Sequence, residues 1–449
     1  MLRVPVLSPS GKPLMPTKAS RARRWLKQRK ARVVYNDLGI FQIQLVVEPF
    51  STNTQPIAVG IDPGKHYTGV GVQSAKFTLW LAHLQLPFKT VKDRMEQRAM
   101  MRRGRRGRRI NRKVAFSQRA HRQKRFDNRR QSKLPPSIRA NRELELRVVD
   151  ELSLIYPITT VAYEIVKARG DKEFSPVMVG QKWQLESLAT YAEVKQVEGW
   201  QTANIRQQLG LHKQKHSKGD AIPATHAVDG VALGCSVFIR YGMIDRQTMG
   251  WKGDVAVTPA PFTVIRRPPI SHRQLHLMAP AKGGVRRKYG GTVTRHGFRK
   301  GDYVEATQGN KTYFGWVSGD TEKQVSVSDA SWKRLGQFTA KKVRLVQPST
   351  GLIVLPTRKL SNDYPVEGSS LTLHETEKNG EAFLYLEQAH QFIRGEAASA
   401  HSRMQRGFAI FLNVLSLTHY PSPPCFAEGG VSRGVSMKVL NDCRDDHAT

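Results

Sequence analysis

Four acid or imidazole side chains stand inside segments that are otherwise apolar. Asp62 ends the run IAVGID, Glu164 lies within TTVAYEIV, and His226 and Asp229 are three residues apart in THAVDGVALG. An ionised carboxylate in such surroundings is costly unless a cation or a metal ion accompanies it. Taken singly, three of these residues also have a structural interpretation: Asp62 as a turn residue, Glu164 as the partner of an arginine, and His226 as a packed helix residue.

Taken together, the four residues indicate hydrolysis of a phosphodiester. That reaction needs a nucleophilic water and stabilisation of charge on the leaving oxygen, and two Mg²⁺ ions held roughly 3.5–4 Å apart by carboxylates supply both. Carboxylates are hard oxygen ligands, so Mg²⁺ or Mn²⁺ is expected and zinc is not. His226 is suited to take or relay a proton near neutral pH.

Strands are expected to position the first two acids. Residues 56–84 predict three successive strands, IAVGID, TGVGVQ and FTLWLAHL. In the first strand, alternation places Ile57, Val59 and Ile61 on one face and Asp62, beside small residues, on the other. Glu164 is placed in the same way in a later strand, on the face of Ala162. The apolar segment from Ala224 onward predicts a helix whose one side carries His226 and Asp229.

The charge of the chain indicates a polyanionic partner. Its 449 residues include 72 Lys and Arg against 36 Asp and Glu, a formal net charge of +36. Nucleic acid is the partner expected for such an excess, because cationic side chains release its counterions on binding. The three cysteines have no Cys-x-x-Cys spacing, which argues against a zinc ribbon and a disulfide framework and fits a reducing cytosol. The longest late apolar run, from Phe408, is too short to cross a bilayer, and the N-terminus lacks a signal peptide.

An arginine-rich segment lies between the first two acids. Residues 92–130 contain 17 Lys and Arg and only three acids. A disordered tail is one interpretation; the segment is internal and free of proline, which favours a long helix that folds against nucleic acid and reaches roughly 55 Å. Gly104 and Gly107 share a face of this helix and would let a phosphate backbone approach. The predicted nucleic-acid-binding residues are Arg102, Arg103, Arg105, Arg106, Arg108, Arg109 and Arg112.

The order of four motifs resembles the split RuvC nuclease of the IscB and IsrB proteins: IDPG at 61–64, the arginine-rich segment, YEIV at 163–166 and HAVDG at 226–230. These proteins are transposon-encoded relatives of type II CRISPR effectors. PLMP at 13–16 resembles the opening domain of that family. RRKYGG at 286–291 and RHGFRKGDYVE at 295–305 resemble its module for a short target-adjacent DNA motif. The resemblance covers roughly residues 1–350. About 65 positions separate Glu164 from Asp229, and they hold no compact His-Asn-His arrangement, which matches the IsrB group without an HNH nuclease.

The resemblance implies an α/β, multidomain protein with a split RNase H-like (RuvC) core, a long arginine-rich bridge helix and a small β-rich C-terminal module. The implied divisions are a PLMP domain at 1–50, RuvC segment I at 51–88, a bridge helix region at 89–145, RuvC segment II at 146–168, a connector in place of HNH at 169–220, RuvC segment III at 221–250, a β-rich module that contacts the target-adjacent motif at 251–350, and a tail of unknown role at 351–449. The tail holds nine Lys and Arg against eleven acids, so it does not share the basic character.

The resemblance also implies an activity. The protein would be an RNA-guided nickase that binds a long noncoding guide (omega) RNA and double-stranded DNA bearing a short adjacent motif, and that cuts the displaced strand. Asp62, Glu164 and Asp229 would be the ligands of two Mg²⁺ ions, and His226 the proton-handling partner. A monomeric ribonucleoprotein, with no membrane partner, in the cytoplasm of a prokaryote and near the nucleoid, is expected.

Three alternatives remain. The first is an RNA-independent, structure-specific nuclease that acts on Holliday junctions or other branched DNA. The second is a non-catalytic RNA-binding protein whose acids serve only structure. A TnpB-like effector is disfavoured because the cysteines of its zinc ribbon are missing.

Overall fold

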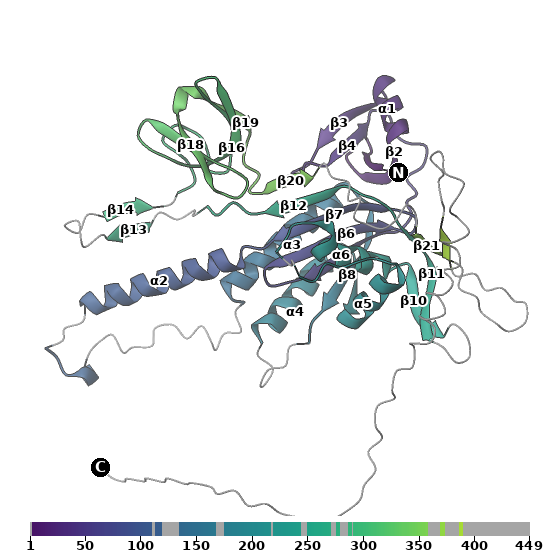
Figure 1. The fold of residues 1–449 in the computed structure, drawn as a ribbon, viewed down its shortest axis with the longest axis horizontal. Coiled ribbons are helices and arrows are strands. Elements are labelled where there is room, and N and C mark those ends of the chain that lie inside the picture. The colour runs from purple at the N-terminus through teal and green to yellow at the C-terminus, as the bar shows by residue number, and fades with distance from the viewer. Residues whose placement is uncertain are drawn as a thin grey trace, which may run out of the picture. The chain divides into compact units, whose positions relative to one another are not determined.

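A computed structural model of the chain describes residues 2–109, 113–118, 134–167, 175–216, 219–243, 249–270, 275–278, 286–289, 291–357, 369–372 and 386–388 (Figure 1). All of these residues belong to one unit, Met1–His390. The unit is a mixed α/β structure with several sheets. In the described part of the chain, no helix is long and apolar enough to cross a membrane.

A seven-stranded mixed sheet forms the centre of the unit. Its strands lie in the order β20-β12-β7-β6-β5-β8-β9. Their bounds are β5 (Ile57–Pro63), β6 (Tyr67–Ser74), β7 (Thr78–Gln85), β8 (Ile158–Ile165), β9 (Glu193–Glu198), β12 (Phe262–Arg266) and β20 (Ile353–Thr357). Strands β5, β6 and β7 form an antiparallel meander, whereas β8 runs parallel to β5 and β9 parallel to β8. The three successive strands predicted from residues 56–84 are confirmed.

Helices cover both faces of this sheet. On one face, Val59 and Ile61 pack with Leu144 and Val148 of α3 (Pro136–Ser153), and α4 (Pro176–Leu188) joins the same cluster. On the other face, Leu81 packs with residues of α5 (Gly199–Gln208) and α6 (Val228–Cys235). The predicted alternation along β5 and β8 is confirmed: their large apolar side chains face α3, and the opposite face carries their acids.

Close contact between α6 and the sheet depends on glycine. A Cβ atom added to Gly60 or Gly71 would clash with the backbone of Gly230, and one added to Gly230 would clash with the backbone of β6. The helix therefore lies directly on β5 and β6, with no side chain between the two backbones at these points. A single π-helical turn, η4 (Pro223–Ala227), precedes α6. The predicted apolar helix is thus present, with His226 in the π turn and Asp229 in α6.

The opening residues form a small sheet with its own core. Strands β1 (Arg3–Leu7), β2 (Pro13–Lys18), β3 (Ala31–Tyr35) and β4 (Phe41–Leu45) lie in the order β2-β1-β4-β3, and α1 (Ala19–Lys27) packs on them. The PLMP motif forms the start of β2.

The arginine-rich segment begins as a helix, α2 (Phe88–Arg109). Residues 110–112 and 119–133 lie outside the described residues. Between these two gaps, residues 113–118 form a turn and a short 3₁₀ helix, η1 (Phe116–Gln118). A continuous helix over 92–130 is therefore wrong at 113–118.

The later strands form further sheets. A five-stranded antiparallel sheet in the order β18-β17-β16-β15-β19 has its own apolar cluster; its strands are β15 (Tyr303–Gln308), β16 (Lys311–Asp320), β17 (Gln324–Ser328), β18 (Arg334–Thr339) and β19 (Val343–Gln347), with a 3₁₀ turn, η6 (Ala340–Lys342). The remaining strands are β10 (Ile239–Met243), β11 (Met249–Val257), β13 (Leu275–Met278), β14 (Arg286–Tyr289), β21 (Ser369–Thr372) and β22 (Leu386–Gln388).

Three strands of the central sheet come from regions that the implied divisions assign outside the RuvC segments. Strand β9 comes from the connector at 169–220 and pairs with β8. Strand β12 comes from the module at 251–350 and pairs with β7, and β20 comes from the tail and pairs with β12. Ile353 of β20 is fully buried. The connector and the first residues of the tail thus belong in part to the core, and the separate β-rich sheet begins only near Tyr303.

Candidate functional site

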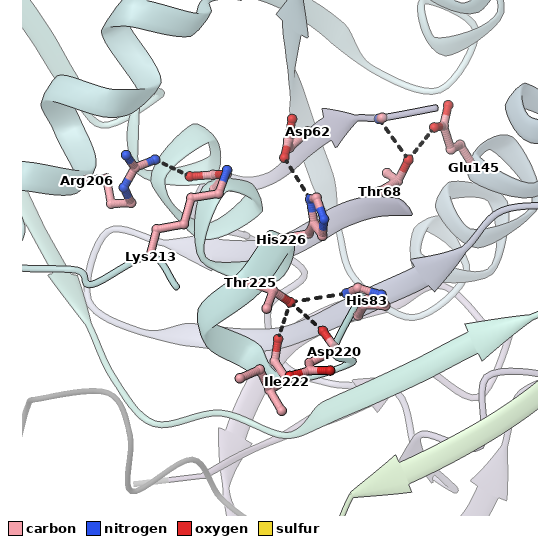
Figure 2. A network of polar contacts seen from close by, with 12 residues as sticks. Asp62, Thr68, His83, Glu145, Arg206, Lys213, Asp220, Ile222, Thr225 and His226 are labelled. Carbon is pink, nitrogen blue, oxygen red and sulfur yellow. Dashed lines mark hydrogen bonds and ion pairs between the residues drawn. The ribbon is translucent and has the colours of Figure 1, made fainter. Parts of the chain in front are cut away.

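Asp62 and His226 lie side by side at the end of β5 (Figure 2). The distance from His226 Nδ1 to Asp62 Oδ2 is 3.7 Å, and each side chain is 15 % exposed. The strand partner of Asp62 on β6 is Gly69, and a Cβ atom there would clash with the backbone carbonyl of His226. The missing side chain of Gly69 is therefore what allows the π turn to bring His226 to Asp62.

Glu164 lies beside Asp62 on the neighbouring parallel strand. Ile61 of β5 is in register with Tyr163 of β8, so the next residue of each strand is the carboxylate. The pKa of Glu164 is raised to about 7, first by burial and then by the negative charges of Asp62 and Asp229, against the opposing effects of Thr202 and Lys213. Like charges act in this way only at short range. The three predicted acids are therefore brought into one electrostatic site.

Asp229 is the most buried of the acids, with 2 % of its surface exposed. Arg206 of α5 contacts one of its carboxylate oxygens and Lys213, in the loop after α5, contacts the other. Burial raises the pKa of Asp229, and the negative charge of Asp62 acts in the same direction, while the two cations oppose the shift. Sequence reasoning missed both cations, because they come from the segment interpreted as a connector.

The three acids have the ligand type that Mg²⁺ prefers, but their arrangement matches a Mg²⁺ site only in part. Hard carboxylate oxygens are the ligands that Mg²⁺ prefers, and the negative charge of Asp62 raises the pKa of both Glu164 and Asp229, a repulsion that a bound cation would relieve. Within the described ranges, however, no three His, Cys, Asp or Glu side chains are arranged as the ligands of one ion. Arg206 and Lys213 contact both carboxylate oxygens of Asp229. Asp62 and Glu164 carry no such pairs among the interactions described.

Two further rings surround His226. Tyr67 stacks on it with ring centroids 5.5 Å apart, and His83 of β7 lies at 5.4 Å. His83 is fully buried, and burial, with a smaller effect of the nearby His226, lowers its pKa to about 4. Its Nδ1 lies 3.4 Å from Thr225 Oγ1. His83 is therefore neutral near pH 7, and the alternation argument used for Glu164 would have found it in FTLWLAHL.

The turn after Asp62 is tied to α3 by a buried network (Figure 2). Thr68 Oγ1 donates to Glu145 Oε1 at 2.7 Å and accepts from the Gly64 amide at 3.3 Å. Glu145 is in turn paired with Arg142 at 2.8 Å, and both side chains are buried. Asn141 Nδ2 donates to the carbonyl oxygen of Lys65. These bonds hold the IDPG turn in place and so fix the direction of Asp62.

The predicted phosphate-binding arginines lie on and beyond α2. Arg102 and Arg103 are exposed. The backbone of residues 105–109 is helical, but the side chains of Arg105, Arg106, Arg108 and Arg109, and all of Arg112, lie outside the described residues. The histidines of the connector, His212 and His216, are exposed.

Comparison with known proteins gives one family. A sequence model described as "RRXRR protein" matches residues 4–184, less than half of the chain. The chain carries the pattern Arg-Arg-x-Arg-Arg twice, at 102–106 and at 105–109. The match spans the opening sheet, α2 and two of the predicted acids, Asp62 and Glu164. No curated protein matches the chain.

Among solved structures, RuvC of Thermus thermophilus aligns with 14 % identity and a TM-score of 0.22, covering 40 % of this chain and 91 % of that one. The structure of T. thermophilus RuvC in complex with a Holliday junction substrate aligns with 12 % identity and a TM-score of 0.21, with the same coverage.

Proposed function

We propose that the protein is a divalent-cation-dependent DNA endonuclease that nicks one strand under the guidance of an RNA. The observation that supports this most is the convergence of Asp62, Glu164 and Asp229, from β5, β8 and α6, with an imidazole 3.7 Å from Asp62. Structural acids of a plain binding protein gain nothing from such mutual repulsion, whereas a site for divalent cations requires it.

Each residue has a definite task in this proposal. Asp62 and Glu164 would hold Mg²⁺, and Asp229 would join them once Arg206 and Lys213 turn away from it. When bound, Mg²⁺ supplies stabilisation of the charge that develops during phosphodiester hydrolysis. His226 takes a proton at Nδ1 or relays it, while Tyr67 and His83 hold its ring. The released guanidinium and ammonium groups of Arg206 and Lys213 would bind a phosphate of the substrate.

Guidance by RNA is supported by charge and by the family match. The chain carries +36, α2 presents Arg102 and Arg103 to solvent, and RRXRR sequences are found in IscB- and IsrB-type proteins. In such a division of labour, base pairing reads the target sequence and the protein holds the backbone of the duplex. An antiparallel meander followed by two parallel strands supports the RNase H-like core that the family resemblance implies.

The test begins with the RNA that copurifies with the full-length protein. We expect one abundant structured species with a variable end. Plasmids that carry the complementary target beside a randomised flank should then be nicked in one strand when Mg²⁺ is present. Asp62→Asn should abolish nicking without loss of RNA, and the exposed Asp254→Asn should change neither. Efficient cleavage of branched DNA by RNA-free protein would instead favour the structure-specific nuclease, and undiminished nicking by Asp62→Asn would refute the site.

A further inference from the structure

Beside the candidate site, large apolar side chains are exposed on one surface. Trp200, Tyr241, Met243 and Met249 are exposed to 51 %, 39 %, 63 % and 54 %. Trp200 is the second residue of α5, and the others lie on the β10–β11 hairpin, where Met243 pairs with Met249 and Tyr241 pairs with the buried Trp251. Figure 1 shows this hairpin next to α5. We define Trp200, Tyr241, Met243 and Met249 as the aromatic surface.

The rings of the aromatic surface are held in a fixed arrangement. The centroids of Trp200 and Tyr241 are 5.7 Å apart with the rings at 79°, and Tyr241 lies 5.2 Å from Trp251. Trp200 Nε1 donates to Glu198 Oε2 at 2.8 Å, and Lys167 Nζ donates to the other oxygen of Glu198. The polar group of the indole is therefore satisfied within the protein, and its need for hydrogen bonding does not explain why the ring is exposed.

The exposure of Trp200 is unusual for this protein. All seven tryptophans lie in the described part of the chain, and Trp200 is the one among them that is exposed. A large ring that stays exposed gains little of the hydrophobic free energy that its burial would contribute to folding. Contiguous exposed apolar patches mark binding surfaces.

The position of the surface connects it to the acids. Gly199 immediately precedes Trp200, and a Cβ atom at Gly199 would lie 3.3 Å from Glu164 Oε1. The aromatic surface thus begins one residue away from a carboxylate of the candidate site. A strand that reaches Glu164 through its phosphate must place neighbouring nucleotides close to α5.

Charge selects the partner. The basic residues Lys195 and Arg240 lie close enough that the positive charge of Arg240, after burial, lowers the pKa of Lys195. Together with the net charge of +36, this favours an anionic ligand with flat apolar faces. Single-stranded nucleic acid has both properties, because its phosphates are anionic and every unpaired base has a face that stacks on an aromatic ring.

We propose that Trp200 and Tyr241 stack on unpaired nucleobases of the strand that enters the candidate site. The identity of that strand rests on the proposed function, but stacking itself requires no cleavage. Because any base can stack, the surface binds without preference for sequence and favours an unpaired strand over a duplex, whose bases are already stacked.

The test measures binding that depends on bases. Full-length protein is titrated in EDTA, at about 0.3 M salt to weaken phosphate contacts, with a fluorescent oligothymidylate and with an abasic strand of the same length. We expect the wild type to prefer the oligothymidylate about tenfold, as base stacking on aromatic side chains generally gives. Trp200→Ala and Tyr241→Ala should bring this ratio close to one, and Trp200→Phe should keep most of it.

A matched control removes an exposed ring elsewhere. Phe314, on β16, is 53 % exposed, and Phe314→Ala should leave the ratio unchanged. An oligouridylate of equal length distinguishes a DNA-specific surface from one that accepts RNA equally. Thermal unfolding checks that each variant is folded, and Tyr241→Ala carries the test if Trp200→Ala is not folded.

Two results would overturn the proposal. One is a ratio that is unchanged in Trp200→Ala and Tyr241→Ala, or already near one in the wild type. The other is a change in sedimentation of Trp200→Ala with an unchanged ratio, which would make the surface a contact between protein chains. Because no metal is present, loss of the stacking ratio and loss of nuclease activity are separate outcomes.

Discussion

The backbone carbonyl of His226 lies where a side chain on Gly69 would have to be. This relationship places the π turn against β6 and leaves His226 3.7 Å from Asp62. The absence of a side chain at Gly69 therefore lets the π turn approach β6 closely enough to bring His226 beside Asp62.

Replacement of Gly69 by alanine should separate the imidazole from the acid. The added methyl group must push the π turn away, at a cost of about 1–3 kcal/mol in the free energy of unfolding, and nicking should fall by at least an order of magnitude. Urea unfolding and a plasmid nicking assay measure the two effects. Gly319→Ala on β16, where nothing lies within 4 Å of the added atom, is the matched control. Full activity in a destabilised Gly69→Ala would contradict a role for His226.

The raised pKa of Glu164 predicts a pH dependence of stability. Its pKa is about 7 in the folded chain and near 4.5 when unfolded. The folded state thus binds more protons between these values, so this residue destabilises the metal-free protein increasingly as pH rises from about 4.5 to 7. Glu164→Gln should therefore gain stability relative to the wild type over this window in EDTA. A stability difference between variant and wild type that does not vary with pH would argue against a shifted carboxyl.

Divalent cations should reverse this trend. Protons and Mg²⁺ compete for the same carboxylate, so stabilisation by added Mg²⁺ should be small near pH 5 and larger near pH 8. Thermal unfolding with and without Mg²⁺ measures it. In Glu164→Gln, the increase of this stabilisation with pH should be weaker, and equal stabilisation at both pH values would not fit competition at Glu164.

Removal of the Lys213 charge from Asp229 should lower the stability of the metal-free protein and raise its affinity for a divalent cation. Lys213→Met removes a cation from a buried carboxylate, so the metal-free protein should lose about 1–3 kcal/mol of unfolding free energy. The same change frees an oxygen of Asp229, so affinity for Mn²⁺ should rise. The exposed Lys215→Met tests for a mere change of net charge. Weaker Mn²⁺ binding by Lys213→Met would place Asp229 outside the ligand set.

Arg102 and Arg103 should contribute to the salt dependence of RNA binding. Both are exposed on α2, and exchange of both for glutamine should reduce the slope of log affinity against log salt by about one to two phosphate contacts. Filter binding across a salt series measures this slope. Lys323→Gln with Lys333→Gln removes the same charge from exposed loops of the five-stranded sheet. An equal loss of slope in that control would show that α2 has no special role.

The fold includes residues beyond position 350, where the basic composition of the chain ends. A chain that ends at residue 390 keeps every described element and should unfold like the full-length protein. A chain that ends at residue 350 loses β20 with the buried Leu352 and Ile353, and also β21, which pairs with β11, and β22, so its melting temperature should be clearly lower. Equal melting temperatures of the two truncations would mean that these three strands contribute little to the stability of the fold.

Local patterns predicted much of this site. Alternation within IAVGID and TTVAYEIV placed Asp62 and Glu164 on the face opposite the main apolar core. The roles of β9 and β20 were not predictable: β9, EVKQVE, is mostly polar, and β20 pairs with β12, which is distant in sequence. Arg206 and Lys213 were missed for the same reason: neither has a local signal, and only the tertiary fold brings them to Asp229.

Binding of Mn²⁺ followed by electron paramagnetic resonance tests the shared cation site most directly. We predict saturable binding by the wild type that is strongly weakened by Asp62→Asn, by Glu164→Gln and by Asp229→Asn, each in a folded protein, and unchanged by Asp254→Asn. Binding that survives all three substitutions, or that is absent from the wild type, would contradict a metal-dependent nuclease built on these acids.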